Sequence, residues 1–384
     1  MDPSSFDNNI HGRLVRTNQG YSAYVPHPLE PDIQLDMELV SILSEADRGL
    51  SELAGVARTL PNPHLLIGPF VRREAVLSSR IEGTQASLSD LFFFEAANLR
   101  KKEVPDVQEV ANYVRALEYG LERVSELPVS LRLIREMHKR LLAGARGEHQ
   151  TPGEFRRSQN WIGPPGFTLM DATYVPPPVE EMKQALYAFE TYLHTPSRFP
   201  PLIRLAMIHY QFEAIHPFLD GNGRIGRLLI TLLLCTQRLL PQPLLYLSAF
   251  FERFRDDYYN LLLSVSQKGK WENWIRFFLR AVATQARDAI RRSDRLLALW
   301  RDYRIRMQEA RASALLLQLV DELFEYPAIT NRRAANRLSI TARSAQLNVQ
   351  KLLNAGILQE ATGQQRNRVY IAPEIIRILE EQQE

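Results

Sequence analysis

Apolar residues recur at the spacing of a helix, every three to four positions, along most of the chain. Prolines and glycines separate these stretches, as they do in short connections between helices. The pattern therefore predicts an all-α fold, a helical bundle with short loops. The predicted helices cover residues 35–57, 65–95, 106–124, 130–143, 179–194, 201–215, 223–239, 251–267 and 271–300.

One segment, residues 155–178, departs from the helical pattern. It contains a Gly-Pro-Pro-Gly run at 163–166 and three prolines at 176–178. Short β-prone pieces at residues 160–162 and 173–175 lie on either side of the first run. We therefore expect an irregular β-hairpin on the surface of the bundle.

The chain beyond Ser313 has a pattern of its own. It predicts three short helices and then two strands around a turn, an order that resembles a winged helix-turn-helix unit. A basic helical stretch before Ser313 would connect this unit to the bundle. Seven basic residues and one acid, Glu360, lie between residues 331 and 370, a local charge of +6. The predicted helices are 315–324, 331–338 and 341–354, the strands are 357–359 and 369–371, and the basic residues are Arg332, Arg333, Arg337, Arg343, Lys351, Arg366 and Arg368.

The composition is that of an ordinary globular protein, with 45% hydrophobic and 24% charged residues among 384. The net charge of +3 is too small to indicate a nucleic-acid protein by itself, so any basic surface must be local. The single cysteine, Cys235, excludes a disulfide within the chain and lies in an apolar run, where it is expected to pack as a small hydrophobe. We expect a cytoplasmic protein without a signal peptide, and no apolar run approaches the ~20 residues of a membrane span.

Residues 216–227, His-Pro-Phe-Leu-Asp-Gly-Asn-Gly-Arg-Ile-Gly-Arg, form the most informative motif. Two glycines flank Asn222 directly before a predicted helix, so backbone N–H groups and the positive end of the helix dipole can hold an anion. Arg224 and Arg227 share one face of that helix, and their forked donors suit phosphate. The loop is therefore a candidate phosphate site.

Two further residues of the motif carry chemistry. Asp220 supplies the hard carboxylate oxygen that Mg²⁺ prefers where phosphates complete its coordination. His216 is a candidate general base, because an imidazole titrates near neutral pH. A base, a metal ligand and a phosphate site within twelve residues indicate phosphoryl or nucleotidyl transfer.

The motif resembles the Fic-family signature, His-Pro-Phe-x-Asp-Gly-Asn-Gly-Arg-x-x-Arg, at every specified position. The resemblance implies an all-helical core that transfers AMP from ATP to a Ser, Thr or Tyr hydroxyl of a protein, including itself. His216 would take the proton from that hydroxyl, Phe218 would anchor the loop and Asp220 would hold Mg²⁺. The ATP phosphates would be bound by the Gly221–Gly223 backbone with the Asn222 side chain, by Gly226, and by Arg224 and Arg227 at the outer phosphates.

The resemblance extends to two segments around the signature. Asp171, Ala172, Thr173 and Tyr174 are similar to the family's flap, a hairpin that covers the nucleotide and pairs with an extended target segment. Tyr258 and Tyr259 occupy the place of aromatic residues near the adenine. Ordinary packing on a helix face explains these tyrosines equally well.

Ser78-Ser79-Arg80-Ile81-Glu82-Gly83 resembles the family's inhibitory motif. Ser78 and Glu82 are four apart and project from one face of a helix, which the glycine then ends. The resemblance implies that Glu82 pairs with Arg227, occupies the place of the γ-phosphate and misaligns ATP. A solvated helix face is the alternative for this short pattern.

These observations predict three domains: an N-terminal helical region at 1–59, a Fic domain at 60–300 with an inhibitory helix at 65–83 and a flap at 155–178, and a connector with a winged-helix-like unit at 301–384. The expected partners are ATP, Mg²⁺, a target protein and a second copy of the chain in a homodimer. Two alternatives stay open. One is transfer of another nucleotide or a phosphate, and the other is a DNA-binding regulator whose Fic core senses nucleotide, with 341–354 as recognition helix and 363–368 as wing.

Overall fold

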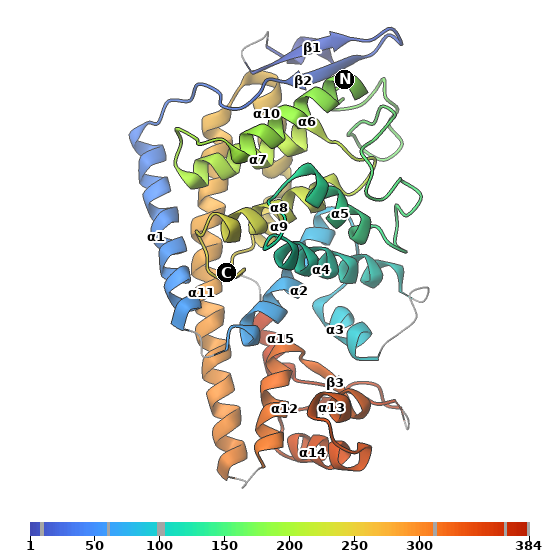
Figure 1. The fold of residues 1–384 in the computed structure, drawn as a ribbon, viewed down its shortest axis with the longest axis vertical. Coiled ribbons are helices and arrows are strands. Elements are labelled where there is room, and N and C mark those ends of the chain that lie inside the picture. Colours follow the sequence, from blue (N-terminus) through green and yellow to red (C-terminus); the bar gives the residue numbers. More distant parts are fainter. Residues whose placement is uncertain (8–10, 60–61, 98–103, 310–312, 365–366, 382–384) are drawn as a thin grey trace.

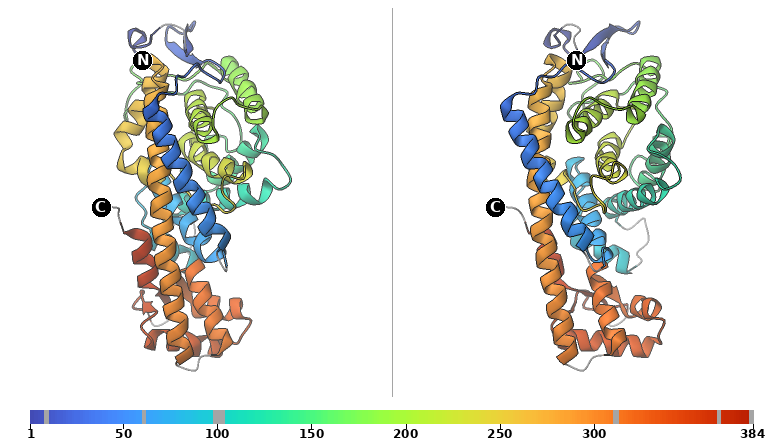
Figure 2. Two further views of the ribbon diagram at one scale, coloured as in Figure 1. Left: turned by 90° about the vertical axis from the view of Figure 1, so that its left-hand side faces the viewer. Right: turned by 60° about the vertical axis from the view of Figure 1, so that its left-hand side comes forward.

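The computed structural model describes residues 1–7, 11–59, 62–97, 104–309, 313–364 and 367–381. Helices form most of it, which confirms the all-α prediction (Figure 1). The longest is α11 (Trp271–Glu309), about 58 Å at 1.5 Å per residue. Helix α1 (Met37–Thr59) lies along α11 in both figures (Figures 1 and 2). Because α11 continues to Glu309, it crosses the boundary expected at residue 300 without a break.

The remaining helices of the bundle pack on one side of this long pair. The central two are α7 (Pro201–Ile215) and α8 (Asn222–Thr236), which contact each other and carry the signature between them. Around them lie α2 (His64–Ile81), α3 (Leu88–Ala97), α4 (Pro105–Arg123), α5 (Leu131–Leu141), α6 (Val179–His194), α9 (Ser248–Arg253) and α10 (Arg255–Lys268). No helix in the described part of the chain is long and apolar enough to cross a membrane.

One prediction for the first hundred residues was wrong. The N-terminal region is not wholly helical: after a short 3-10 turn, η1 (Pro3–Ser5), β1 (Gly12–Arg16) and β2 (Ser22–Pro26) form an antiparallel hairpin. The hairpin depends on a distant segment, because Tyr24 N–H donates to the carbonyl of Val175 in the flap at 2.9 Å. The helical pattern over 65–95 is two helices, α2 and α3, and the break between them lies at the glycine expected to end the inhibitory helix at 65–83. The chain leaves α2 at Gly83, whose φ of 92° suits glycine.

The C-terminal unit contains more elements than predicted. The three expected helices are α12 (Ala314–Glu325), α13 (Asn331–Leu338) and α14 (Ala342–Asn354), and the two expected strands are β4 (Gln359–Glu360) and β5 (Val369–Ile371). A further strand, β3 (Ala328–Thr330), and a last helix, α15 (Pro373–Glu380), were not predicted. The strands form one antiparallel sheet in the order β3-β5-β4.

Helices α13 and α14 meet at a short turn whose residues are set by local chemistry. Ser339 is left-handed, with φ 52°, and ends α13. Thr341 then caps α14, because its hydroxyl accepts a hydrogen bond from Ser344 N–H at 3.2 Å. The sequence from Asn331 to Asn354 thus forms two helices with a tight turn between them.

The C-terminal unit packs directly on α2 through its first helix. A Cβ atom placed at Gly68 in α2 would lie 2.9 Å from the backbone oxygen of Glu325, at the end of α12. Beside it, the Arg72 guanidinium lies 4.5 Å from the ring centre of Tyr326. Glycine is therefore the residue that lets α2 and α12 approach this closely.

We expect Gly68→Ala to destabilise the protein by about 1–3 kcal/mol, because the added methyl group meets a backbone atom. Urea unfolding of the full chain measures this change. Gly55→Ala in α1 is the matched control, since a Cβ there would meet no atom within 4 Å. The control should gain up to about 1 kcal/mol from helix propensity alone. Equal stability of the two variants would contradict the close packing of α2 on α12.

Candidate active site

His216 lies where α7 ends and the loop before α8 begins. Its backbone is left-handed, with φ 48° and ψ 60°, so the chain turns sharply there. Its Nδ1 lies 3.2 Å from the carbonyl oxygen of Glu213. Because a carbonyl can only accept, Nδ1 carries the hydrogen and Nε2 keeps its lone pair. Burial lowers the pKa of His216 to about 4, so the imidazole is neutral near pH 7 and Nε2 can accept a proton.

The loop after His216 is shaped by the Asn222 side chain. Asn222 Oδ1 accepts from the N–H of Phe218 at 2.8 Å, and Asn222 Nδ2 donates to the Phe218 carbonyl at 2.9 Å. The Phe218 ring is buried and stacks on His138 with ring centroids 3.7 Å apart, so it anchors the loop as predicted. Both polar atoms of the Asn222 side chain thus hold the loop itself, and the phosphate role expected for this side chain stays a prediction.

Three residues outside the signature hold the carbonyls of this loop. His138 Nε2 bonds to the carbonyl of Asp220 at 2.9 Å, and Asn160 Nδ2 donates to that of Phe218 at 2.8 Å. Arg156, almost fully buried, donates from Nε to the carbonyl of His216 at 3.0 Å. These bonds fix the shape of the loop before α8. The first N–H groups of α8 have no acceptor inside the helix, so they can bind an anion. Sequence analysis missed the role of these three residues, since their partners are backbone atoms that no motif marks.

A cavity of about 570 Å³, here called the main cavity, opens beside the loop. It lies between the end of α2, the flap (residues 155–178) and α10. The structure therefore brings together residues predicted from four separate stretches of sequence. Those that line the main cavity are Glu82, Thr173, Tyr174, His216, Gly223, Arg227, Tyr258 and Tyr259.

The flap is the irregular hairpin that we predicted. Ile162 and Tyr174 form a single antiparallel bridge, with N–H to carbonyl distances of 2.9 and 3.0 Å. The Tyr174 hydroxyl donates to the carbonyl of Ala214 at 2.8 Å, which fastens the flap to α7. Beside the bridge, Trp161 lines the main cavity with 44% of its surface exposed. The flap thus offers exposed backbone and an aromatic surface at the cavity mouth.

Two predicted flap residues lie outside the main cavity. Asp171 is exposed, and one of its carboxylate oxygens accepts from the hydroxyl of Thr168 at 2.8 Å. Ala172 is buried in a small apolar cluster with Tyr21 and Val175. The prediction that these two contact nucleotide is therefore not met by their positions. The next two residues of the flap, Thr173 and Tyr174, do line the main cavity.

The two tyrosines of α10 both line the main cavity but differ in burial. Tyr258 is 1% exposed, and its hydroxyl bonds to His209 Nε2 at 2.9 Å. It also stacks on Phe251 with ring centroids 4.6 Å apart, so Tyr258 serves packing as well. Tyr259 is 40% exposed and presents its ring to the opening. Packing on a helix face thus describes Tyr258, and the place of the two tyrosines near an adenine stays a prediction.

Arg227 joins α8 to the end of α2. Its Nη2 lies 2.7 Å from Glu82 Oε1 and also donates to the Ser78 carbonyl at 3.0 Å, while its Nε donates to the Ser78 hydroxyl at 2.8 Å. Burial alone would lower the pKa of Arg227, but the Glu82 carboxylate outweighs it and the pKa is raised. Burial would likewise raise the pKa of Glu82, and Arg227 instead holds it below its usual value. The pair is thus ionised, as predicted from the inhibitory motif.

Arg224 has a different environment from Arg227. Its guanidinium is buried, pairs with Glu109 of α4 and lies 3.1 Å from Asp220 Oδ1. It does not line the main cavity, and neither do Gly221, Asn222 and Gly226. We expected Arg224 and Arg227 to bind phosphate together. In this arrangement Arg224 is instead paired with Glu109, a partner that the sequence did not indicate.

Asp220 is the candidate metal ligand, and its surroundings fit Mg²⁺. Asp220 Oδ1 accepts hydrogen bonds from Gly221 N–H at 2.6 Å and from Arg224 Nη2. The other oxygen, Oδ2, lies beside Gly147. Within the described ranges no three His, Cys, Asp or Glu side chains gather to form a metal site of their own. A single carboxylate beside a phosphate site matches the preference of Mg²⁺ for phosphate and water as its other ligands.

Glu213 is a buried acid that sequence analysis missed. It lines the main cavity one helical turn before His216, and its Oε1 has no hydrogen-bond partner among the described residues. Burial raises the pKa of Glu213 to about 8. A Cβ at Gly226 would lie 2.2 Å from this oxygen, so Gly226 is needed for packing against Glu213 and not for phosphate contact.

Comparisons with known proteins agree with the signature and the fold. The Fic/DOC family N-terminal domain matches residues 40–122, and the Fic/DOC family domain matches residues 128–234. "Protein adenylyltransferase Fic" of Drosophila willistoni is 32% identical over 139 residues, which are 35% of this chain and 25% of that protein. The protein of the same name from Drosophila grimshawi is 29% identical over 182 residues, 46% of this chain and 33% of its own length. The chain thus spans a quarter to a third of these relatives.

A solved structure of a Fic family protein from Desulfovibrio desulfuricans has the same fold. Its TM-score is 0.57 at 17% identity, and the match covers 90% of this chain and 98% of that one. The likeness therefore extends well beyond the two matched domains. The two matches and the complete signature between α7 and α8 show that this chain carries a Fic/DOC family N-terminal domain at 40–122 and a Fic/DOC family domain at 128–234.

Proposed function

We propose that this protein is an adenylyltransferase that moves AMP from ATP to a hydroxyl group of a protein. The observation that supports it most directly is the neutral His216, whose Nε2 is free to accept a proton beside an anion-binding helix start. The proteins named adenylyltransferase that match this chain support the same reaction. Asp220, which lines a separate pocket beside the loop, would hold Mg²⁺, and this ion would neutralise part of the charge on the phosphates.

In this proposal, His216 Nε2 takes the proton from a Ser, Thr or Tyr hydroxyl of the target. The hydroxyl oxygen forms a bond to the α-phosphorus, and the bond from that phosphorus to the bridging oxygen breaks, so pyrophosphate leaves. The N–H groups at the start of α8, including that of Gly223 in the cavity wall, would stabilise the charge that develops on the phosphate. Tyr258 and Tyr259 would enclose the base. Burial of the pocket strengthens each of these interactions.

The flap supports a protein as acceptor. An extended target segment could pair with its exposed backbone by main-chain hydrogen bonds, which place a hydroxyl without demanding a particular sequence. Trp161 and Ile162, 44% and 38% exposed, would contact the side chains of that segment.

Glu82 would act as a brake on this reaction. Its carboxylate and Ser78 already occupy three of the hydrogen-bonding directions of Arg227, and only Nη1 lacks a partner among the described residues. An outer phosphate of ATP must compete with them for this arginine. We therefore expect ATP to bind in a shifted position, and a shift near 1 Å costs ~10²-fold in rate.

The first test is transfer of label from α-³²P-ATP with Mg²⁺. Wild type should label itself weakly, Glu82→Gly should label itself up to ~10²-fold faster, and His216→Ala should lose ~10²- to 10⁴-fold relative to an intact base. Parallel reactions with UTP, CTP and GTP test the runner-up, transfer of another nucleotide. The proposal would be contradicted by faster labelling from UTP, CTP or GTP than from ATP. It would also be contradicted if Glu82→Gly transferred label from none of the four nucleotides.

A second test uses the pH dependence of Glu82→Gly. The base acts as neutral imidazole, so transfer is full above the pKa of His216 and is lost as pH falls through it. Because burial lowers that pKa to about 4, the acid limb should have its midpoint near 4 and not near the ordinary value of ~6.5. Circular dichroism over the same range controls for unfolding. A midpoint near 6.5 would exclude a buried His216 as the base.

We propose DNA contact by the C-terminal unit as a second function. The order of elements from α12 to β5, with the sheet order β3-β5-β4, is that expected for a winged helix, and α14 would be its recognition helix. The exposed face of α14 carries side chains that read or hold DNA: Arg343, Gln346, Gln350, Lys351 and Asn354.

The basic patch predicted from sequence is smaller in the structure. Arg333 and Arg337 both lie against Glu322 of α12, at 3.7 and 2.7 Å, and over the ring of Tyr326. They therefore serve the packing of the unit, and Arg366 lies outside the described residues. The basic residues left for phosphate contact are the exposed Arg332, Arg343, Lys351 and Arg368.

A gel-shift series at rising salt tests this function. Each phosphate contact contributes about −0.9 to the slope of log K against log salt, so Arg343→Gln with Lys351→Gln should make the slope shallower by ~2. Arg48→Gln, an exposed change on α1, is the control and should leave the slope unchanged. Absence of any shift at low salt would rule the function out. The homodimer and the cytoplasmic location stay predictions of the resemblance.

A further inference from the structure

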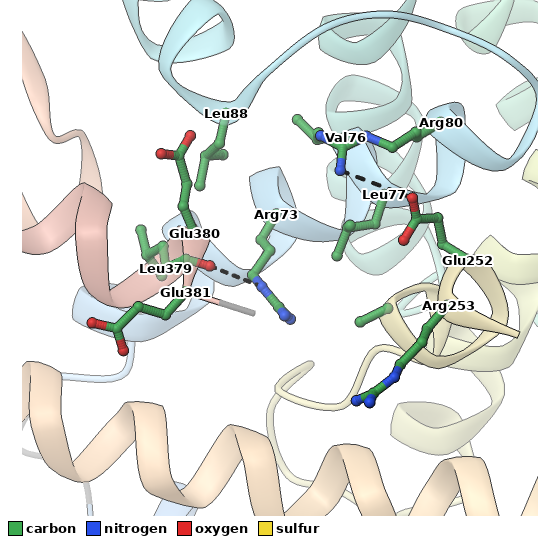
Figure 3. A pocket seen from close by; sticks show the side chains of 11 residues that line it. Arg73, Val76, Leu77, Arg80, Leu88, Glu252, Arg253, Leu379, Glu380 and Glu381 are labelled. Carbon is green, nitrogen blue, oxygen red and sulfur yellow. Dashed lines mark hydrogen bonds and ion pairs between the residues drawn. The ribbon is translucent and has the colours of Figure 1, made fainter. Parts of the chain in front are cut away.

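A second cavity, here called the rear cavity, lies behind the inhibitory helix α2. It has a volume of about 410 Å³ and is lined by α2, the start of α3, α9 and the end of α15 (Figure 3). None of its lining residues lines the main cavity. Segments that are far apart in sequence thus enclose a space of the size that small ligands use.

Helix α2 presents one face to each cavity. Ser78 and Glu82 face Arg227, while Arg73, Leu77 and Arg80 follow the rear cavity at helical spacing. Arg80 lies only two residues before Glu82. Anything that fixes the rear face of this last turn therefore also fixes the position of the Glu82 carboxylate.

Arg73, which lines the rear cavity, shares its carboxylate partner with two other arginines. Arg73 Nε donates to the carbonyl of Leu379 at 3.0 Å (Figure 3). Arg73 Nη2 lies 3.6 Å from Asp288. The same Asp288 carboxylate also pairs with Arg291 at 2.9 Å and with the buried Arg292 at 2.8 Å. One carboxylate thus serves three guanidinium groups. Burial, and next the charge of Arg292, lower the pKa of Arg73 to about 10.

The acids around the rear cavity already have partners. Both carboxylate oxygens of Glu381 bond to Arg295, and Glu380 accepts from the N–H and hydroxyl of Ser89 at 3.3 and 3.2 Å. Glu252 lies 3.9 Å from Arg80. The charge that would gain most from a new partner is therefore the Arg73 guanidinium, which Figure 3 shows between the end of α15 and α9.

The rest of the wall is apolar and would suit the body of an organic molecule. Val76, Leu77, Leu88, Ala249 and Leu379 contribute it. We propose that the rear cavity binds a small organic anion, with a phosphate or carboxylate on Arg73 and an apolar body against these side chains. The anion would bridge α2 to α9 and α15.

The effect of such a ligand on activity rests on the proposed function of Glu82. The rear cavity exists in the arrangement in which Glu82 holds Arg227, so a ligand that fits it stabilises that arrangement by mass action. The ligand therefore slows adenylyl transfer. The effect requires Glu82, because without the carboxylate the position of α2 no longer blocks the phosphate site.

Calorimetric titration of the full chain tests binding without reference to activity. The probes are phenyl phosphate and phenylacetate, which distinguish the two head groups, with benzyl alcohol as the neutral counterpart. Arg73→Gln removes the charge, and Ala249→Phe fills the space while leaving every charge in place. Arg301→Gln, exposed on α11, is the control.

We expect at least one anion to bind, with affinity at least ~10-fold lower in both cavity variants and unchanged in the control. The proposal is overturned if neither anion binds up to about 10 mM, if benzyl alcohol binds as well as the anions, or if binding survives in Ala249→Phe. The last result would place the probe elsewhere, such as the main cavity. If Arg73→Gln does not fold, the affinity of Ala249→Phe for the anions tests by itself whether they bind in the rear cavity.

Self-labelling with α-³²P-ATP then tests the regulatory effect. A saturating anion should slow wild type and leave Glu82→Gly unchanged, whereas competition in the main cavity would slow both. An unchanged wild-type rate at saturation overturns the regulatory effect. If no variant transfers label, the proposed function has failed, and the calorimetry still decides whether the rear cavity binds an anion.

Discussion

The ion pair between the buried Arg227 and Glu82 is the contact on which the rest of the site depends. It joins the second turn of α8, the helix that begins at the phosphate site, to Glu82, the residue that caps the end of α2. A buried arginine without a carboxylate would be an uncompensated charge, so the pair is strongly favoured until another anion replaces it. The outer phosphates of ATP are such an anion. Inhibition and substrate binding therefore use the same guanidinium.

Helix α2 connects this pair to distant parts of the molecule. On one side it reaches α8 through Ser78 and Glu82, and on another it packs against α12, where Gly68 allows the close approach. Arg73 joins it to the carbonyl of Leu379 at the end of the chain. A displacement of the C-terminal unit could thus move α2, and α2 would change the contact between Glu82 and Arg227. The proposed rear-cavity ligand would contact α2 itself, whereas the proposed DNA contact lies on α14, in the unit that packs on α2 through α12.

Most of the side chains that fix the shape of the catalytic loop lie outside the signature. Asn222 closes the loop on Phe218, but the carbonyls that must point away from the phosphate site are held by His138, Arg156 and Asn160. These donors come from α5 and from the first residues of the flap. The shape of the anion site is therefore a property of the whole bundle, as expected for a site that must be rigid before substrate binds.

The sequence alone determined the helices, the irregular hairpin, the signature and the inhibitory motif, because each is written in local spacing: apolar periodicity, glycine and proline breaks, and a Ser and Glu four residues apart. It did not show the β1-β2 hairpin, the role of Glu109 on Arg224, the buried Glu213 or the commitment of Arg333 and Arg337 to packing. Only the tertiary structure decided these, since each depends on a partner that folding brings from a distant part of the chain. The local sequence pattern determines which polar and charged side chains lie near the site. Burial and pairing with residues from distant parts of the chain decide which of these side chains can still bind a ligand or react.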